Sequence, residues 1–451
     1  MKASAFGWAG ILIGGTLLAL GPGCAPAPPD ANVSQPRADA LAPEADAEPS
    51  TVADTANSAR AERRDKLNSQ RIRKRRLAPQ EDMEQLQAIG YVQTSDVSAA
   101  GAQAGVVQKD GARTAPGINL FVSAHAPVAY LMGLDGTIRH SWRCPLDEAW
   151  PDFEVPSDIR ADSGSHWRRV YAYPNGDLLA IFENIGMIKL DKASNLLWAY
   201  QGKCHHAMDV APNGNIFVLA NNVVTGQSGG KDVWTRNPTI CELDGNGKEL
   251  RIIDVLECFR NSIYRPILDT MRDTGDIFHT NTIHVLDGAH AARSPAFQAG
   301  NLLICSRQLS CVAIIDPAKA AVVWALSGMW QGPHEPTFLD NGHMLIFDNR
   351  RFEGRSQVLE FDPFTQEIVW RYAGTDDDPL WSAACSLAQR LPNGNTLITE
   401  TQGARVIEVN AAGEIVWQYV NTNTVPGSDK LANIHMMLRL PPDFDTSWIG
   451  G

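Results

Sequence analysis

The chain has 451 residues and a mass of 49.1 kDa, which is long enough for one large body or two smaller domains. Hydrophobic residues make up 44% and charged residues 20%, a globular composition that excludes a chain disordered throughout. The net charge of −12 and the isoelectric point near 5.4 argue against a nucleic-acid-binding protein, which needs a basic face. Thirty-seven glycines and 27 prolines, with few long periodic stretches, predict short strands and many turns.

Residues 1–24 have the pattern of a secretory signal peptide. Lys2 precedes an apolar stretch over residues 9–20, which is too short to span a membrane, and small residues then lead to Cys24. A cysteine directly after a small residue predicts a bacterial lipoprotein in which Cys24 becomes lipidated. The alternative is simple cleavage near Ala25, with Cys24 lost. In either case we expect a periplasmic or cell-surface protein, and a lipid on Cys24 would anchor it to the membrane.

Residues 25–115 are predicted to form a disordered tether. The segment 25–58 is rich in Ala, Pro, Asp, Glu and Ser, with almost nothing to bury. Nine Lys and Arg residues then fall within 60–76, and this basic segment either lies on anionic headgroups or forms a solvated helix of mixed charge. A short amphipathic helix is expected over 81–92. The folded domain is therefore predicted to comprise residues 116–451.

A repeated pair of hairpins predicts the architecture of this domain. Turns of the Asn-Gly type between apolar runs recur at 174–179, 212–217, 340–345 and 392–397. A second hairpin, with a tryptophan near its end in every copy but the third, recurs at 129–142, 188–200, 241–253, 312–326, 358–372 and 406–419. Six copies of about 54 residues are typical of an all-β, six-bladed propeller with four antiparallel strands in each blade.

The two ends of the repeat array are predicted to complete one blade together. The first repeat starts at Gly117 without an opening strand, and residues 435–442 resemble an opening strand with no blade after it. Their pairing would close the ring and remove the open sheet edge. The repeat tryptophans are then expected to pack between blades: Trp142, Trp198, Trp324, Trp370 and Trp417.

Basic side chains recur at equivalent positions of the opening strands. The residue seven places before the turn Asn, or before the position aligned with it, is Arg168, His206, His334 or His435 in four of the repeats. In the fourth repeat the count ends one place after His279, and in the last repeat it ends at Ser386. Opening strands line the central channel of a propeller, so these residues should share one depth near one mouth. The end of a blade's second strand returns to the mouth where the opening strands begin, so Arg307, at the end of such a strand, should lie at the same mouth. We expect Arg168 and His435 to contact substrate there.

A ring of His and Arg around a channel suits an anion whose charge changes during a reaction. Arginine offers a permanent bidentate fork for an oxyanion, and histidine can be a nucleophile or a proton donor near neutral pH. A single histidine is more often a packing residue, but the shared register favours a chemical role for His206 and His334. His205, His284, His290 and His343 are expected to be structural or superficial, whereas His125, His140 and His166 stay undecided.

Convergent histidines also suit zinc or copper. No carboxylate accompanies them in register, however, and Arg168 and Arg307 would repel a cation, so we expect no metal and no other cofactor. The eight cysteines contain no close Cys-x-x-Cys pair, which disfavours a zinc knuckle. Their pairing cannot be deduced from the sequence, and burial as small strand residues is the simpler interpretation.

Four motifs together resemble the bacterial arylsulfate sulfotransferases, which are periplasmic six-bladed propellers. The motifs are His205-His206 before an Asn-Gly turn, Phe278-His279-Thr280-Asn281, Ser306-Arg307-Gln308, and Gly332-Pro333-His334-Glu335-Pro336-Thr337. The likeness extends over residues 117–442. It implies transfer of a sulfuryl group from an aryl sulfate to a phenol, without a nucleotide sulfate donor.

The resemblance also implies a role for each matching residue. His334 resembles the nucleophile that becomes a sulfohistidine. His279 and Arg307 resemble the groups that hold the sulfuryl oxygens. His206 resembles the channel histidine that assists there or at the phenolic oxygen, and Asn281 is expected to orient His279 or the sulfate.

Two other classes of protein remain open. The run 362–370 resembles the tryptophan-docking repeat of quinone-dependent propeller oxidoreductases, which usually need eight blades and a calcium site. A non-catalytic cell-envelope scaffold would function without His334 and Arg307. Well-studied sulfotransferases of this kind also carry a folded N-terminal domain where this chain has its tether, so oligomeric state does not carry over. The residues that line the acceptor side are not identifiable by motif, so acceptor choice stays open.

Overall fold

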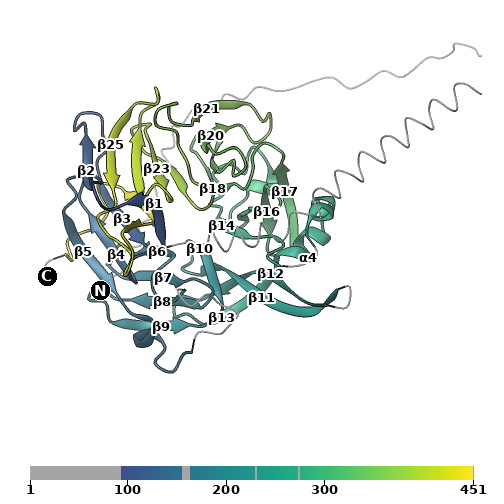
Figure 1. The fold of residues 1–451 in the computed structure, drawn as a ribbon. Coiled ribbons are helices and arrows are strands. Elements are labelled where there is room, and N and C mark those ends of the chain that lie inside the picture. Colours follow the sequence, from purple (N-terminus) through teal and green to yellow (C-terminus); the bar gives the residue numbers. More distant parts are fainter. Residues whose placement is uncertain (1–92, 155–162, 229–230, 273–274, 450–451) are drawn as a thin grey trace, which may run out of the picture. The chain divides into compact units, whose positions relative to one another are not determined.

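Short antiparallel strands joined by glycine-containing turns make up most of the structure. The computed structural model describes residues 93–154, 163–228, 231–272 and 275–449. The predicted signal peptide, Cys24, the basic segment and the helix over 81–92 lie outside these residues. The described residues form six blades around a common axis, as the repeat pattern predicts (Figure 1). Six blades rather than eight also count against the quinone-dependent oxidoreductases.

Each blade has four strands of the repeat, which run from the opening strand at the channel outward; the sixth blade carries one additional strand, described below. The first three blades are β27 (Ile434–Leu440), β3 (Ile118–Ser123), β4 (Val128–Met132) and β5 (Ile138–Arg143); β6 (Arg169–Ala172), β7 (Leu178–Phe182), β8 (Gly186–Leu190) and β9 (Leu196–Tyr200); and β10 (Cys204–Val210), β11 (Ile216–Ser228), β12 (Lys231–Leu243) and β13 (Glu249–Asp254). The last three are β14 (Thr280–Val285), β15 (Leu302–Ser306), β16 (Cys311–Asp316) and β17 (Ala321–Ser327); β18 (His334–Phe338), β19 (Met344–Asp348), β20 (Gln357–Phe361) and β21 (Ile368–Tyr372); and β22 (Leu387–Arg390), β23 (Thr396–Glu400), β24 (Arg405–Val409) and β25 (Ile415–Val420).

The burial of each strand follows from its place in the blade. Every residue of the second strands β7, β15, β19 and β23 is buried, because neighbouring blades cover both faces of the sheet. The outermost strands β9 and β21 are mostly exposed. The opening strands β6, β10, β14, β18, β22 and β27 each contact the opening strands of both neighbouring blades. These six strands therefore form a closed ring around the channel.

The C-terminal strand closes the propeller, as predicted. β27 pairs with β3 along its whole length, so the first blade takes its opening strand from the end of the chain. Arg439 on β27 donates from Nε to Asn119 Oδ1 at 2.6 Å and from Nη1 to Glu408 Oε2 at 3.1 Å. Glu408 lies on β24 of the sixth blade, and all three side chains are buried. A buried ion pair thus joins the last blade to the first.

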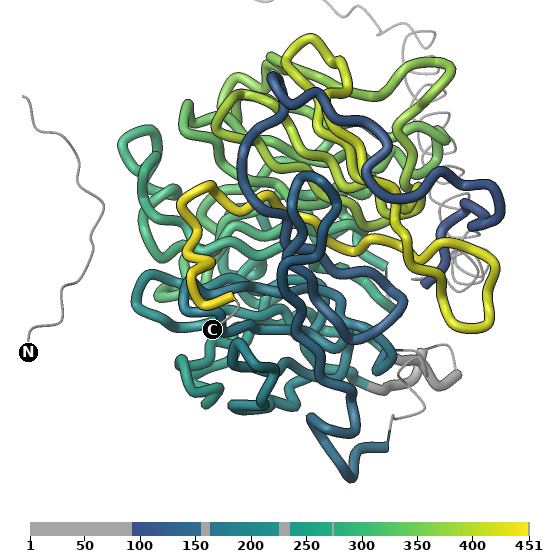
Figure 2. Tube along the Cα trace, turned by 90° about the vertical axis from the view of Figure 1, so that its left-hand side faces the viewer, coloured from purple at the N-terminus to yellow at the C-terminus, as the bar shows by residue number. Residues whose placement is uncertain are grey.

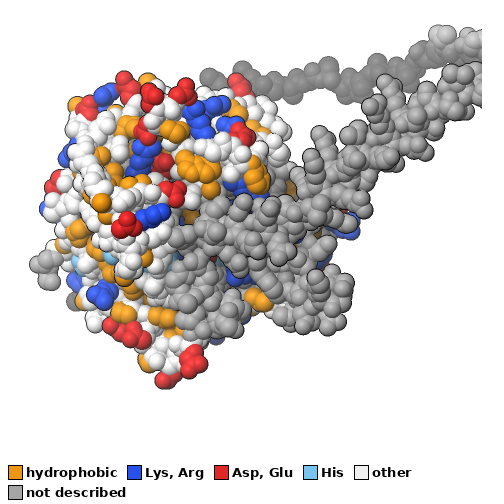
Figure 3. Space-filling model, in the orientation of Figure 1, with side chains coloured by type: hydrophobic (Ala, Val, Ile, Leu, Met, Phe, Trp, Pro, Cys, Tyr) orange, Lys and Arg blue, Asp and Glu red, His pale blue; other side chains and the backbone are white. Residues whose placement is uncertain are grey.

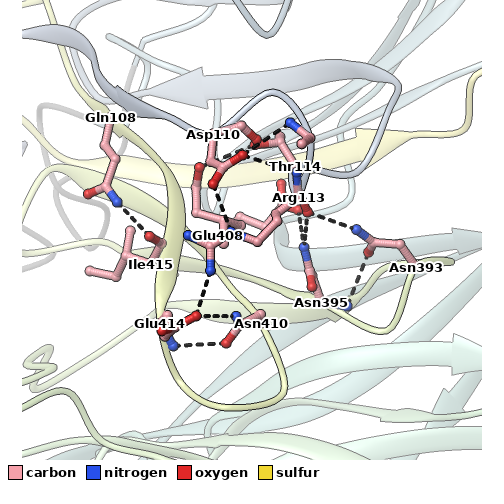
Figure 4. Close-up of polar contacts among 12 residues, drawn as sticks. Gln108, Asp110, Arg113, Thr114, Asn393, Asn395, Glu408, Asn410, Glu414 and Ile415 are labelled. Carbon is pink, nitrogen blue, oxygen red and sulfur yellow. Dashed lines mark hydrogen bonds and ion pairs between the residues drawn. The ribbon is translucent and has the colours of Figure 1, made fainter.

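Two strands precede the first repeat and correct the predicted tether boundary at residue 115. β1 (Thr94–Ser98) pairs with β26 (Lys430–Ala432), and β2 (Gly105–Lys109) adds a fifth strand to the sixth blade beside β25 (Figure 2). The partners are edges far away in the sequence, which local composition does not reveal. After β2, Arg113 donates to Asp110 at 2.7 Å and to Glu414 at 2.6 Å (Figure 4).

The repeat tryptophans link neighbouring blades. Four of the five predicted residues donate the indole N–H to a backbone oxygen in a turn of the next blade: Trp142 to Gly176 (2.9 Å), Trp198 to Gly245 (3.2 Å), Trp370 to Ala411 (3.1 Å) and Trp417 to Leu134 (3.0 Å). Trp324 instead packs edge-to-face against Phe297 of its own blade. The predicted packing between blades is confirmed for the four.

Within the residues that the structure describes, helices are short and lie between strands. They are α3 (Leu146–Ala149), α4 (Val255–Arg260) and the 3-10 turns η1 (Arg265–Thr270) and η2 (Pro295–Phe297). Among the described residues no helix is long and apolar enough to cross a membrane. The seven cysteines of the described residues are buried and free, which fits their interpretation as small core residues. On the face seen in Figure 3, acidic and basic side chains are interspersed.

Candidate active site

The opening strands are irregular where the predicted site residues lie. His206, His279 and Glu335, which directly follows His334, have left-handed φ angles of 52°, 53° and 50°. Strand pairing shifts register close to these positions in the third, fourth and fifth blades. Such bulges re-aim side chains, and a non-glycine residue keeps this conformation only where its surroundings enforce it. The irregularity brings the rings of His206 and His279 to 4.8 Å between centroids.

His334 is held in one tautomer. Its Nδ1 lies 2.6 Å from Asn349 Oδ1 and 3.2 Å from the carbonyl oxygen of Gly332. The Asn349 amide cannot be turned over, because its Nδ2 donates to the carbonyl oxygens of Ser382 and Cys385 at 2.7 and 3.0 Å. Both neighbours of Nδ1 are therefore acceptors, so Nδ1 carries the proton and Nε2 carries the lone pair.

The lone pair of His334 Nε2 is buried and has no hydrogen-bond partner among the described residues. Burial, together with the charge of Arg307 and the proximity of His279, holds the pKa of His334 well below its usual value. The imidazole is therefore neutral at physiological pH. A neutral, uncommitted ring nitrogen is what a nucleophilic histidine requires.

Arg307 supplies positive charge next to His334. Its backbone N–H donates to the carbonyl oxygen of His279 at 3.0 Å, and its side chain is 3% exposed. Within the described part of the chain, Nε and Nη1 of Arg307 find no hydrogen-bond acceptor. A buried guanidinium with uncommitted donors is costly unless an anion binds it. The geometry therefore offers an oxyanion site beside His334.

Two carboxylates, which the sequence analysis missed, hold the other channel histidines. Glu183 Oε1 lies 3.1 Å from His206 Nδ1, and Asp276 Oδ2 hydrogen-bonds His279 Nδ1. Burial alone would raise the pKa of Glu183, but His206 and Arg168 hold it well below its usual value. Burial outweighs these carboxylates and lowers the pKa of His206 to about 4, and that of His279 also falls. As in a Ser-His-Asp triad, the carboxylate fixes which ring nitrogen faces the site.

Arg168 and His435 lie on the side of the first and second blades. Arg168 Nε is 3.7 Å from Glu183 Oε2, and its Nη2 is 3.2 Å from Cys385 Sγ. His435 stacks on His166 at 4.9 Å between ring centroids. Both ring nitrogens of His435 are buried and find no partner among the residues that the structure describes. In the order of the blades, these two residues come before His206 on the third blade. Arg307 and His334 come after it, on the fourth and fifth blades.

Asn281 has a different local role from the one expected. Its Nδ2 donates to the carbonyl oxygen of Pro333 at 2.8 Å, and its Oδ1 accepts from Thr282. The side chain therefore fixes the backbone directly before His334. His279 is oriented instead by Asp276, which lies in the segment before β14 and carries no repeat signal.

The missed residues Glu183 and Asn349 do follow a pattern in the sequence. Each lies seven residues after a turn glycine, Gly176 or Gly342, as Arg307 does after Gly300. These positions end the second strand of a blade and return to the mouth where the opening strand begins. Glu183 also corrects the argument that no carboxylate accompanies the histidines, because its carboxylate and the rings of His205 and His206 offer ligand atoms within 4.8 Å of one another.

Comparison with known proteins identifies the family. The arylsulfotransferase (ASST) family matches residues 170–422, more than half of the chain. The chain belongs to the arylsulfotransferase family. Five of the predicted site residues lie in the matched range: His206, His279, Asn281, Arg307 and His334. Arg168 and His435 lie outside it, so their assignment rests on register alone. No curated protein matches the chain.

Several solved structures are similar to this arylsulfotransferase family member at low sequence identity. A protein of unknown function from Bacteroides caccae is 17% identical, with 71% of this chain and 98% of that chain covered and a TM-score of 0.46. A streptogramin B lyase is 13% identical, with 74% and 85% covered and a TM-score of 0.40. Virginiamycin B lyase from Staphylococcus aureus is 11% identical, with 73% and 88% covered and a TM-score of 0.38.

Proposed function

We propose that this protein transfers a sulfuryl group from an aryl sulfate to a phenolic acceptor, without a nucleotide sulfate donor. The reaction would proceed through a sulfohistidine on His334. Membership of the arylsulfotransferase family supports the sulfotransferase class. The observation that carries the mechanism is the fixed tautomer of His334, whose lone pair on Nε2 is uncommitted and adjacent to the charge of Arg307.

In the first half-reaction, His334 Nε2 attacks the sulfur atom of the aryl sulfate. The S–N bond forms as the ester S–O bond breaks, and the phenolate leaves with the electron pair of that bond. His334 keeps its Nδ1 proton, which stays directed at Asn349. The negative charge in the transition state is spread over the sulfuryl oxygens, so positioning and fixed positive charge are the main requirements. Arg307 supplies donors for these oxygens, and His279, whose Nδ1 proton is directed at Asp276, donates from Nε2 as the imidazolium form that Asp276 and the bound anion both favour.

In the second half-reaction, the acceptor phenol attacks the same sulfur from the channel. The S–N bond breaks and His334 recovers its lone pair. With its Nδ1 proton directed at Glu183, His206 presents a lone pair on Nε2 and can take the phenolic proton. That proton then passes to solvent or to the released phenolate. The scheme predicts ping-pong kinetics.

The remaining assignments belong to the same proposal. Asn281 would keep His334 in position through Pro333, and Arg168 and His435 would contact the substrate from the opposite side of the channel. The export signal and the lipid on Cys24 would place the enzyme in the periplasm or at the cell surface, anchored to the membrane.

A transfer assay on the full-length protein tests the proposal. The donor is p-nitrophenyl sulfate, the acceptor is a simple phenol, and release of nitrophenolate is followed. We expect release to depend on the acceptor and to fall by roughly 10³-fold or more in His334→Ala. His343→Ala is the matched control, because His343 pairs with Glu360 on the same blade outside the site. Full activity in His334→Ala would exclude the nucleophile, and no release with any phenol would favour a scaffold.

Arg307→Lys tests the oxyanion site separately. Lysine keeps the charge but lacks the planar fork, so we expect loss of most of kcat/KM, about 10²-fold. Arg293→Lys is the control, because Arg293 binds Gly342 and Asp362 away from the channel. Equal activity in both variants would contradict a specific role for the guanidinium of Arg307.

A further inference from the structure

Three ligand atoms converge between the second and third blades. Glu183 Oε1 lies 3.1 Å from His206 Nδ1, and His205 Nδ1 lies 2.9 Å from the same atom. All three side chains are buried. The ligand atoms lie within 4.8 Å of one another. No other triad of this kind occurs among the described residues.

The protons available to these atoms do not satisfy all of them. If His206 Nδ1 carries a proton toward Glu183, His205 Nδ1 directs a lone pair at an N–H that is already engaged. If His205 Nδ1 carries the proton toward His206, the lone pair of His206 faces the carboxylate. In the first arrangement one N–H is shared between two acceptors, and in the second the lone pair of His206 and a carboxylate oxygen face each other. A cation among the three atoms would accept all three lone pairs at once.

The fold builds the triad from an unusual backbone conformation. Adjacent residues of a strand normally direct their side chains to opposite faces of the sheet. The φ angle of 52° at His206 breaks this alternation and lets both Nδ1 atoms meet. Glu183 Oε2 accepts from the His206 backbone N–H at 3.1 Å and lies 3.7 Å from Arg168 Nε. The other oxygen, Oε1, is thereby directed at the imidazoles.

The ligand set and spacing define the class of ion. Two imidazole nitrogens and one carboxylate oxygen suit zinc or a similar first-row metal rather than magnesium or calcium. In a tetrahedral zinc site with bonds of about 2.0–2.1 Å, ligand atoms lie roughly 3.3 Å apart. The distances of 2.9 and 3.1 Å are close to this spacing.

We propose that Glu183, His205 and His206 form an inhibitory binding site for a divalent transition-metal ion such as Zn²⁺. A metal on His206 Nδ1 places the ring proton on Nε2, so His206 could no longer accept the phenolic proton. This consequence rests on the proposed sulfuryl transfer, whereas metal binding itself does not. Arg168 beside Glu183 opposes the cation, so we expect micromolar rather than tighter affinity.

Cobalt binding tests the site without relying on activity. Co²⁺ is added to the chelator-treated full-length protein, and the visible d–d absorption is recorded. We expect one equivalent of Co²⁺ to give the intense bands of tetrahedral coordination in the wild type and in His343→Gln. The control removes a histidine from another histidine–carboxylate pair, because His343 lies 2.9 Å from Glu360. His205→Gln should abolish the bands. Absence of bands in the wild type, or equal bands in His205→Gln, would overturn the site.

Two further measurements separate the site from its consequence. Anomalous scattering from wild-type crystals soaked in ZnCl₂ should show a peak among the three ligand atoms. This measurement uses the wild type alone, so it does not depend on whether a variant folds. A peak elsewhere only would overturn the site. In the transfer assay, Zn²⁺ should lower the rate at least about tenfold in the wild type and less than about twofold in His205→Gln. Metal binding with an unchanged rate would refute inhibition, and bands without any transfer would refute the sulfotransferase and leave the site intact.

Discussion

At the scale of single residues, the partner of each imidazole Nδ1 separates the roles of the channel histidines. His334 faces the neutral amide of Asn349, whereas His206 and His279 face the carboxylates of Glu183 and Asp276. A carboxylate stabilises the imidazolium form and so favours proton transfer. An amide fixes the same tautomer without that charge, which leaves the other nitrogen as a neutral nucleophile.

Removal of the Asn349 amide should therefore damage catalysis more than folding. In Asn349→Ala the proton of His334 is free to move to Nε2, so we expect kcat to fall roughly 10²- to 10⁴-fold. Steady-state kinetics with p-nitrophenyl sulfate measure the change, and circular dichroism reports the fold. Asn341→Ala is the matched control, because Asn341 bonds Glu360 on the same blade outside the channel. A kcat equal to that of the control would show that the tautomer is fixed in another way.

At the scale of elements, a regular hairpin repeat makes much of the architecture predictable. Each Asn-Gly turn fixes the phase of the strand before it, and this phase identifies His206 and His334 from the sequence alone. Applied to the strand after the turn, the same count would also identify Glu183 and Asn349. Asp276 lies outside any strand, so no register could reveal it. The strands β1 and β2 were missed because their pairing is non-local and their composition is weak.

The seam that closes the ring should be the most sensitive interface of the propeller. Glu408 is buried and accepts from Arg439 Nη1, Asn395 Nδ2 and the backbone N–H of Ala115. Glu408→Gln would leave the Arg439 charge without its partner, and we expect a loss of about 3–5 kcal/mol in the free energy of unfolding. Denaturant unfolding measures this quantity.

The exposed ion pairs of the same seam provide the comparison. Arg113 contacts Asp110 and Glu414 at the surface, so Arg113→Ala should cost less than about 1 kcal/mol (Figure 4). If both substitutions cost the same, closure of the ring would not depend on the buried pair.

At the scale of the whole molecule, several histidines are buried together inside an acidic protein. Burial, with Arg307 and His279 nearby, holds the pKa of His334 well below 6.5, and burial with Arg168 and His166 nearby does the same for His435. His284 opposes this trend, because Glu335 outweighs burial and raises its pKa. On balance, the unfolded chain binds more protons than the folded protein just below pH 6.5.

Stability should therefore fall as the solution becomes acidic. The contribution of neutral His334 and His435 to the free energy of unfolding is complete above about pH 6.5. It is lost as the pH falls toward their folded-state pKa values. We expect Tm to drop by roughly 10 °C between pH 7.5 and pH 5, measured by calorimetry in the presence of a chelator. A Tm that stays constant or rises over this range would contradict the neutral, buried state of these histidines.

Direct detection of the covalent intermediate tests the central proposal most directly. The protein is mixed with p-nitrophenyl sulfate without acceptor, quenched at alkaline pH, digested, and analysed by mass spectrometry. We predict a sulfuryl group on the peptide containing His334, in amounts that match the burst of nitrophenolate and disappear when phenol is added before the quench. A burst without modification of His334, or a sulfuryl group on another residue, would contradict the account.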